Sequence, residues 1–336
     1  MPFETLLIGN EPALRLAIFV SALVLVALWE LLAPRRVLQL PRRVRWANNL
    51  GLAAVNIFVV RVLFPSAVIS MAILANERGA GLFNAFPVPY PLAMILSLLA
   101  LDLMMYLMHL MFHAVPALWR VHRVHHADVD FDVTTSVRFH PVQVVLMIPI
   151  KFAVVFVLGP PVLAVLVFEA TFNAFLAFSH SNVRVPAPVD RVLRWFIVTP
   201  DVHRLHHSVD ATESNSNFGF ALTWWDRLLG TYRAQPSAGH ERMVIGVDQF
   251  RARRDSRLDR LLVQPFHGDA GGYDIARRWR AGPDIHDFTC RTAGCRIHPH
   301  RLQLRAAALH RLFCRLGHAR RAVGQIRGAN SVKARK

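Results

Sequence analysis

The chain has 336 residues, of which 54% are hydrophobic, and its formal net charge is +17. This apolar content excludes an ordinary soluble domain and favours an integral membrane protein. The charge does not indicate a nucleic-acid partner, because residues 268–336 hold 15 Lys or Arg against 4 Asp or Glu. That segment alone carries +11 of the total, so the excess belongs mainly to the C-terminal tail.

Three apolar segments in the first third of the chain are long enough to cross a bilayer, which takes about 20 residues. They cover residues 12–32, about 50–74 and about 92–112. Five arginines between residues 35 and 45 follow the first segment, and the positive-inside bias places them in the cytoplasm. Two further crossings then return the chain to the cytoplasmic side.

A fourth apolar segment, residues 142–178, is divided by Gly159, Pro160 and Pro161 into halves of about 17 residues. The segment therefore predicts a helical hairpin that enters and leaves by the cytoplasmic face. Lys151 and Glu169 within it are costly unless they pair, snorkel or face the interior. The predicted fold is an all-α integral membrane protein with about four membrane-embedded helical units, three spans plus the hairpin, and a cytoplasmic histidine-rich helical cap.

Histidines concentrate in the middle of the chain, with ten of the 17 between residues 109 and 207 and none before residue 109. Eight of them form one HxxxH and two HxxHH patterns. Residues three or four apart share a helix face, so we expect each pattern to point its rings at one place, as metal ligands do. A single buried histidine is more often a hydrogen-bonded core residue, but so many buried rings are costly unless something binds them. The eight predicted metal ligands are His109, His113, His122, His125, His126, His203, His206 and His207.

This ordered set of histidine patterns resembles the fatty acid hydroxylase superfamily, which includes the sterol desaturases. The resemblance covers about residues 90–235 and also rests on RFHP at 138–141, FSHSN at 178–182, NFG at 217–219 and WDRLLGTY at 225–232. It implies a centre of two metal ions, normally iron, on the cytoplasmic side. Such a centre uses O2 to hydroxylate or desaturate a C–H bond of a membrane lipid or sterol-like substrate. The resemblance also adds His180 to the ligands.

Four further residues are candidates for orienting the ligands: Asp102, His140, Asp201 and Asn217. Asp102 lies two helical turns before His109 and on the same helix face. Gln143 stands where the superfamily pattern leads us to expect an acid.

Two function classes follow. The first is the lipid-oxidising enzyme, whose electrons must come from a separate reductase, ferredoxin or cytochrome, because the chain holds no flavin, nicotinamide or haem fingerprint. The second is a membrane protein whose histidines hold zinc without redox chemistry, and zinc is also possible in the purified enzyme. Metal analysis separates the two.

The chain divides into a membrane-embedded catalytic domain, residues 1–267, and a basic tail, residues 268–336. The tail matches no motif of the superfamily, and its composition predicts either disorder or a basic amphipathic helix. We expect metal binding to survive its removal.

Overall fold

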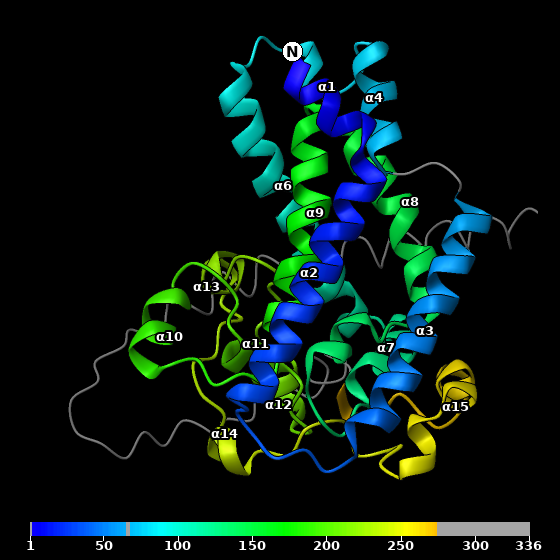
Figure 1. Ribbon diagram of the computed structural model, residues 1–336, viewed down its shortest axis with the longest axis vertical. Coiled ribbons are helices and arrows are strands. Elements are labelled where there is room, and N and C mark those ends of the chain that lie inside the picture. Colours follow the sequence, from blue (N-terminus) through cyan, green and yellow to red (C-terminus); the bar gives the residue numbers. More distant parts are fainter. Residues whose placement is uncertain (1, 65–67, 274–336) are drawn as a thin grey trace, which may run out of the picture. The chain divides into compact units, whose positions relative to one another are not determined.

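The computed structural model describes residues 2–64 and 68–273 (Figure 1). Within these residues every regular element is a helix, 15 α-helices and four short 3-10 helices, and no β-strand occurs. The all-α prediction is confirmed. The disorder or amphipathic helix predicted for the tail lies, from residue 274 onward, outside the described residues.

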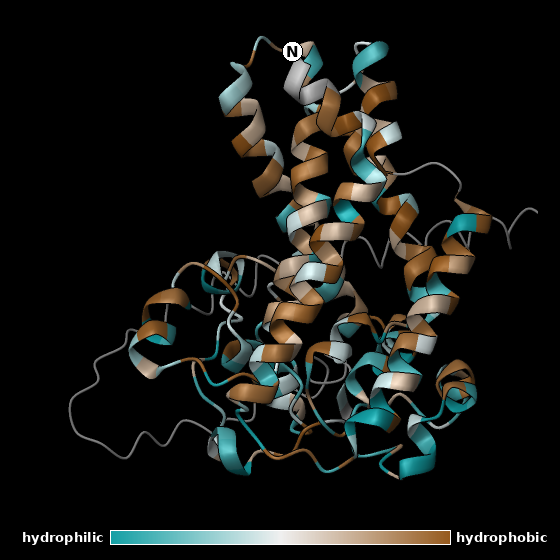
Figure 2. Ribbon diagram, in the orientation of Figure 1, coloured by the Kyte–Doolittle hydropathy of each residue, from teal (hydrophilic) through white to brown (hydrophobic). Residues whose placement is uncertain are grey.

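The apolar helices gather at one end of the molecule and the hydrophilic residues at the other (Figure 2). Among the residues that the structure describes, five stretches are long and apolar enough to cross a membrane: α2, the run from α3 to α5, α6, α8 and α9. The helices at this end are α1 Pro2–Gly9, α2 Glu11–Leu32, α3 Arg42–Leu63, α4 Val68–Glu77, α5 Leu82–Ala85, α6 Tyr90–Ala114, α8 Pro141–Leu158 and α9 Val162–Ser179.

The second predicted span, about residues 50–74, lies within the candidate span Arg42–Ala85. Its described residues include α3, which ends at Leu63, and α4, which begins at Val68.

The predicted hairpin is present as α8 and α9, and the turn between them is tightly packed. Gly159 ends α8 in the left-handed conformation, with φ 59°. A Cβ at this position would lie 2.4 Å from the Ala80 carbonyl oxygen, so the turn requires glycine. Lys151 in α8 donates to Glu169 in α9 at 2.7 Å, which pairs the two charges inside the apolar segment. Arg15 of α2 lies 3.5 Å from the other oxygen of Glu169.

The hydrophilic end consists of short helices and the loops between them. Helices α6 and α9 end in this region, and they bring His113 and His180 there (Figure 1). The elements of this end are α7 Pro116–His126, η1 Val133–Val137, α10 Ala187–Leu193, α11 Pro200–His206, α12 Ala211–Ser214, α13 Trp224–Leu229, α14 Gly239–Arg242, η2 Arg253–Ser256, α15 Leu258–Val263, η3 Gln264–Phe266 and η4 Gly271–Tyr273.

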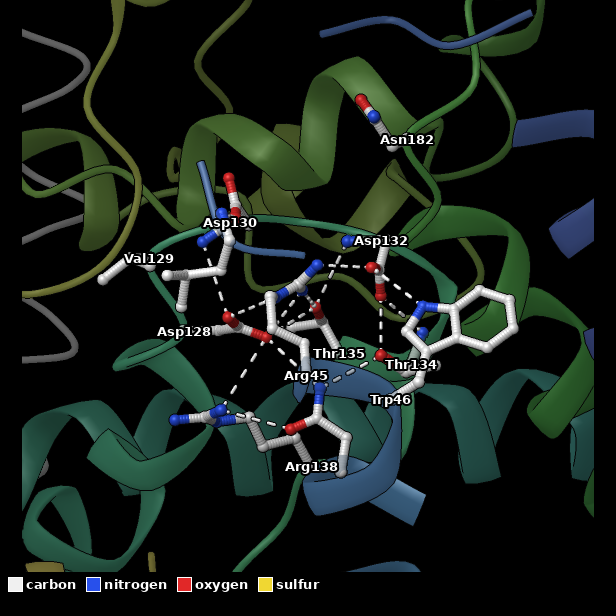
Figure 3. A network of polar contacts seen from close by, with 12 residues as sticks. Arg45, Trp46, Asp128, Val129, Asp130, Asp132, Thr134, Thr135, Arg138 and Asn182 are labelled. Carbon is white, nitrogen blue, oxygen red and sulfur yellow. Dashed lines mark hydrogen bonds and ion pairs between the residues drawn. The ribbon is translucent and has the colours of Figure 1, made fainter. Parts of the chain in front are cut away.

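A buried ion network joins the start of α3 to the loop after α7 (Figure 3). The Arg45 guanidinium donates to both oxygens of Asp128 at 2.8 Å and also to Asp132, and all three side chains are fully buried. Burial raises the pKa of Asp128, but Arg45 and Arg138 outweigh it and hold that pKa well below its usual range. Asp132 in turn caps η1. The network therefore anchors the chain directly after the histidines of α7.

Candidate metal centre

Nine histidines meet in two buried groups where α6, α7, α9 and α11 come together. The ring nitrogens of each group lie within 4.8 Å of one another. These are the eight histidines of the three sequence patterns together with His180. The first group contains His109, His113, His122, His126 and His206; the second contains His125, His180, His203 and His207.

Each HxxHH pattern is divided between the two groups, which differs from the expectation that its rings point at one place. In α7, His122 and His126 belong to the first group while His125 belongs to the second. In the third pattern His203 and His207 belong to the second group and His206 to the first. The reason is helix geometry: residues four apart lie nearly in line, whereas neighbours are turned by about 100°. Each pattern thus serves two sites.

The Nε2 atoms within each group almost touch. In the first group His109 Nε2 lies 3.1 Å from His122 Nε2 and 3.0 Å from His206 Nε2. In the second, His180 Nε2 lies 3.1 Å from His125 Nε2 and 3.0 Å from His203 Nε2. The two groups are neighbours, since the rings of His126 and His207 stack with centroids 4.4 Å apart.

The hydrogen bonds of the Nδ1 atoms determine the tautomer of these histidines. Nδ1 of His109 donates to the Phe218 carbonyl at 2.8 Å, and Nδ1 of His206 donates to the Ser216 carbonyl at 2.7 Å. Nδ1 of His122 lies 3.1 Å from the Gln143 side-chain oxygen and Nδ1 of His113 lies 3.3 Å from that of Asn215. A neutral ring with its proton on Nδ1 presents a lone pair at Nε2.

Four lone pairs therefore face one another in the first group, an arrangement that repels unless a cation lies between them. In the second group Nδ1 of His180 donates to the Leu176 carbonyl at 2.8 Å, whereas the Nδ1 atoms of the other three rings have no hydrogen-bond partner among the described residues. Burial adds to this: it lowers the pKa of His180 to about 3 and lowers the pKa values of His125, His203 and His207 well below the usual value. Neutral imidazole is the ligand form for iron and zinc, so the residues present fit two metal ions.

A family and several curated proteins match this chain. The fatty acid hydroxylase family matches residues 94–231, which include all nine histidines. Ornithine lipid hydroxylase OlsE of Rhizobium tropici is 27% identical over 226 residues, which cover 65% of this chain and 67% of that protein. Residues 94–231 of this chain thus match the fatty acid hydroxylase family, and the relatives support the fatty acid hydroxylase/sterol desaturase superfamily.

Two other relatives share a shorter region. Alkylglycerol monooxygenase of Xenopus tropicalis is 30% identical over 138 residues, 41% of this chain and 30% of that protein. Cholesterol 25-hydroxylase of Rattus norvegicus is 30% identical over 146 residues, 42% of this chain and 47% of that protein. The chain thus spans less than half the length of these two relatives, and no solved structure matches it. The similarity to these hydroxylases and to a monooxygenase supports an oxidoreductase.

The superfamily motif NFG forms the wall beside His109 and His206. Asn217 has a positive φ of 53° and donates from its amide to the Val202 carbonyl of α11, which aims the carbonyls of Ser216 and Phe218 at the rings. Gly219, the last residue of the motif, leaves no room for a side chain, since a Cβ would lie 2.6 Å from the Leu222 carbonyl oxygen. Asp226 of the WDRLLGTY motif accepts the amides of Phe218 and Gly219 at 2.8 Å each.

The four residues predicted to orient ligands lie outside the ring clusters. Asp102 accepts from the Trp225 indole at 2.8 Å and from two amides of the 221–222 segment, so it holds that loop and not His109. His140 caps α8. Asp201 pairs with Arg35 and Arg204, and the Asn217 side chain hydrogen-bonds to the backbone of Val202 and Arg233. Spacing on a helix face singled out Asp102. It could not show that the carboxylate accepts hydrogen bonds from a loop that is distant in the sequence.

Gln143 and Asn215 occupy the orienting role, and we expect replacement of Gln143 by leucine to lower metal affinity about 10–100-fold. The leucine has a similar volume but leaves Nδ1 of His122 without its acceptor. The matched variant Gln143→Glu keeps an acceptor oxygen and should retain the metal. Metal content after dialysis against graded chelator concentrations measures both. Equal retention in the leucine variant would show that His122 needs no partner.

The boundary predicted at residue 267 falls inside a packed segment. The fully buried Trp119 donates its indole N–H to the Ala270 carbonyl at 2.8 Å and stacks on Tyr273 with ring centroids 5.6 Å apart. Trp119 also lies 4.8 Å from the His113 ring, and the Tyr273 carbonyl accepts from Asn215 at 2.9 Å. Residues 268–273 therefore support the first histidine group.

Two truncations test this support. A chain that ends after residue 267 should lose metal from the first group, because Trp119 and Asn215 lose their partners. A chain that ends after residue 283 keeps those partners and should bind metal like the full chain. Metal-to-protein ratios after size-exclusion chromatography compare the two. Equal ratios would restore residue 267 as the domain boundary.

Proposed function

We propose that this protein is a membrane di-iron oxygenase that hydroxylates a C–H bond in the hydrocarbon chain of a membrane lipid. The observation that carries the proposal is the pair of buried histidine groups, five and four rings, where the apolar helices α6 and α9 meet α7 and α11. Nitrogen ligands of this kind suit iron, and bound iron supplies the redox chemistry that activates O2. The named relatives are hydroxylases and monooxygenases, which favours hydroxylation over desaturation.

The residues around the site support a lipid chain as substrate. The His109 ring lies 5.0 Å from the Phe220 ring, which lies 5.3 Å from Phe172 in α9. Phe220 belongs to an apolar cluster formed mainly by α4, α6, α8 and α9, with Met104, Met105 and Met108 of α6 among its members. Such surroundings exclude water from the reacting carbon and accept a hydrocarbon chain. Polar partners hold the Nδ1 protons of five rings in place, so that their Nε2 atoms stay available; these rings are His109, His113, His122, His180 and His206.

The test traces isotopically labelled oxygen from O2 into the lipid. Membranes that contain the protein are supplied with 18O2 and an amino-acid-headgroup lipid such as an ornithine lipid, and the lipids are analysed by mass spectrometry. The expected product is heavier than the lipid by one 18O atom. A product that carries oxygen from water, or a lipid pool that is identical with and without the gene, would contradict the proposal. Zinc as the sole metal in freshly purified protein that forms no oxidised lipid would support non-redox metal binding instead.

We also propose that the histidine groups face the cytoplasm, because the basic loop between α2 and α3 lies at their end of the molecule (Figure 1). A cysteine at the exposed Gln235 should react with an impermeant maleimide only after the cytoplasmic face is opened. A cysteine at the exposed Ala85, at the opposite end, should react in intact cells. The native Cys290, Cys295 and Cys314 are replaced by serine first. The reverse labelling pattern would place the site on the outer side.

A further inference from the structure

A small hollow opens at the end of the molecule that points away from the apolar helices. Its wall includes residues 36–39 of the loop between α2 and α3, which crosses this end between α14 and the start of α3 (Figure 1). Asn182 and Ile245 complete one side, and residues 129–131 form the floor. The loop is held firmly: the amides of Gln39 and Leu40 both donate to Asp130, and Arg36 donates to the Met243 carbonyl at 2.8 Å.

Phe131 in the floor connects this hollow to the second histidine group. Its ring stacks on His180 with centroids 5.6 Å apart and meets the edge of His207 at 5.0 Å. The Phe131 side chain is buried, so one aromatic ring separates the hollow from the candidate ligands. The guanidinium of Arg204 lies 5.4 Å above the same ring.

The surface around the hollow is basic and carries an unpartnered apolar residue. The backbone amide of Arg184 donates to the Ala33 carbonyl, which places it beside this loop, and Arg242 precedes the Met243 that binds Arg36. Arg43 follows on the first turn of α3, and all three arginines are exposed. The exposed acid here, Glu241, is already paired with Arg35. Val37, on the rim of the hollow, is 96% exposed.

We propose that this face docks a small acidic one-electron carrier protein of the iron–sulfur or haem class, and that electrons enter past Phe131. The proposal rests on the proposed function. Hydroxylation breaks a C–H bond and forms a C–O bond, while the second oxygen atom leaves as water. The reaction consumes one O2, two protons and two electrons, and the electrons come from the reduced carrier. A basic rim attracts an acidic protein, and an exposed valine at its centre suits the apolar middle of an interface.

The test separates electron delivery from chemistry. The full chain in lipid nanodiscs is driven either by an acidic [2Fe–2S] ferredoxin with its reductase or by dithionite, and hydroxylated lipid is measured. The variants Val37→Asp, Arg43→Glu and Arg242→Glu change exposed side chains, and Arg191→Glu on α10 is the matched control. We expect each rim variant to lower ferredoxin-driven kcat/KM about fivefold or more and to weaken its dependence on salt. Dithionite-driven rates and the Arg191 variant should stay at the wild-type level.

Four results would overturn the docking face. The rim variants could leave the ferredoxin-driven rate unchanged, or Arg191→Glu could lower it equally. The same variants could instead abolish binding to phosphatidylglycerol vesicles while turnover persists, which would assign the face to a lipid surface. If the wild-type protein formed no product even with dithionite, the proposed oxidation would be wrong, and the docking proposal with it.

Discussion

Replacing His206 by alanine is expected to remove one metal ion per chain and to lower product formation at least 100-fold. His206 belongs to the first group, where its Nε2 lies 3.0 Å from that of His109, and its loss leaves a gap in the ring of lone pairs. His203→Ala should remove the other ion, because His203 belongs to the second group. Metal analysis by mass spectrometry, together with 18O2 incorporation into lipid, measures both effects.

The matched control for these two variants is His267→Ala, since His267 is exposed and lies outside both groups. It should keep two ions and full activity. If His206→Ala and His203→Ala each lost both ions, the two sites would be one cooperative unit. If either variant kept both ions and its activity, the assignment of that histidine as a ligand would be wrong.

The second large effect is expected at Arg45, where substitution by leucine should destabilise the protein by about 3–5 kcal/mol. The leucine would leave Asp128 and Asp132 buried with no guanidinium between them, and an uncompensated buried charge is costly (Figure 3). Because Asp128 follows His126 by two residues, the loop that ends α7 should loosen and metal retention should fall. Thermal unfolding in detergent, followed by circular dichroism, measures the loss.

Two further variants make this measurement specific. Arg45→Lys keeps a charge but cannot reach both carboxylates in the forked geometry of a guanidinium, so an intermediate loss is expected. Arg43→Leu removes an exposed arginine two residues away and should change the melting temperature little. Equal melting temperatures for Arg45→Leu and Arg43→Leu would show that the buried network contributes nothing to stability.

Local patterns along the chain were enough to predict most of the fold. Hydropathy located α2, α6 and the α8–α9 hairpin, because a bilayer requires long apolar runs and the glycine and prolines at 159–161 interrupt one of them. The same local signals indicated that Lys151 and Glu169 would be costly unless they paired, snorkelled or faced the interior, and the structure pairs them. Helical spacing, with the superfamily resemblance for His180, selected the nine histidines that come together.

Tertiary structure alone decided how these residues divide and what surrounds them. Helical spacing places two rings on one face but does not say which ring from another helix will meet them, so the split into five and four rings depended on how α6, α7, α9 and α11 pack. The partners of the rings come from far along the chain: the Phe218 carbonyl for His109, and the Tyr273 carbonyl behind Asn215 and His113. Contacts over such separations leave no periodic signal, since only folding brings the two segments together.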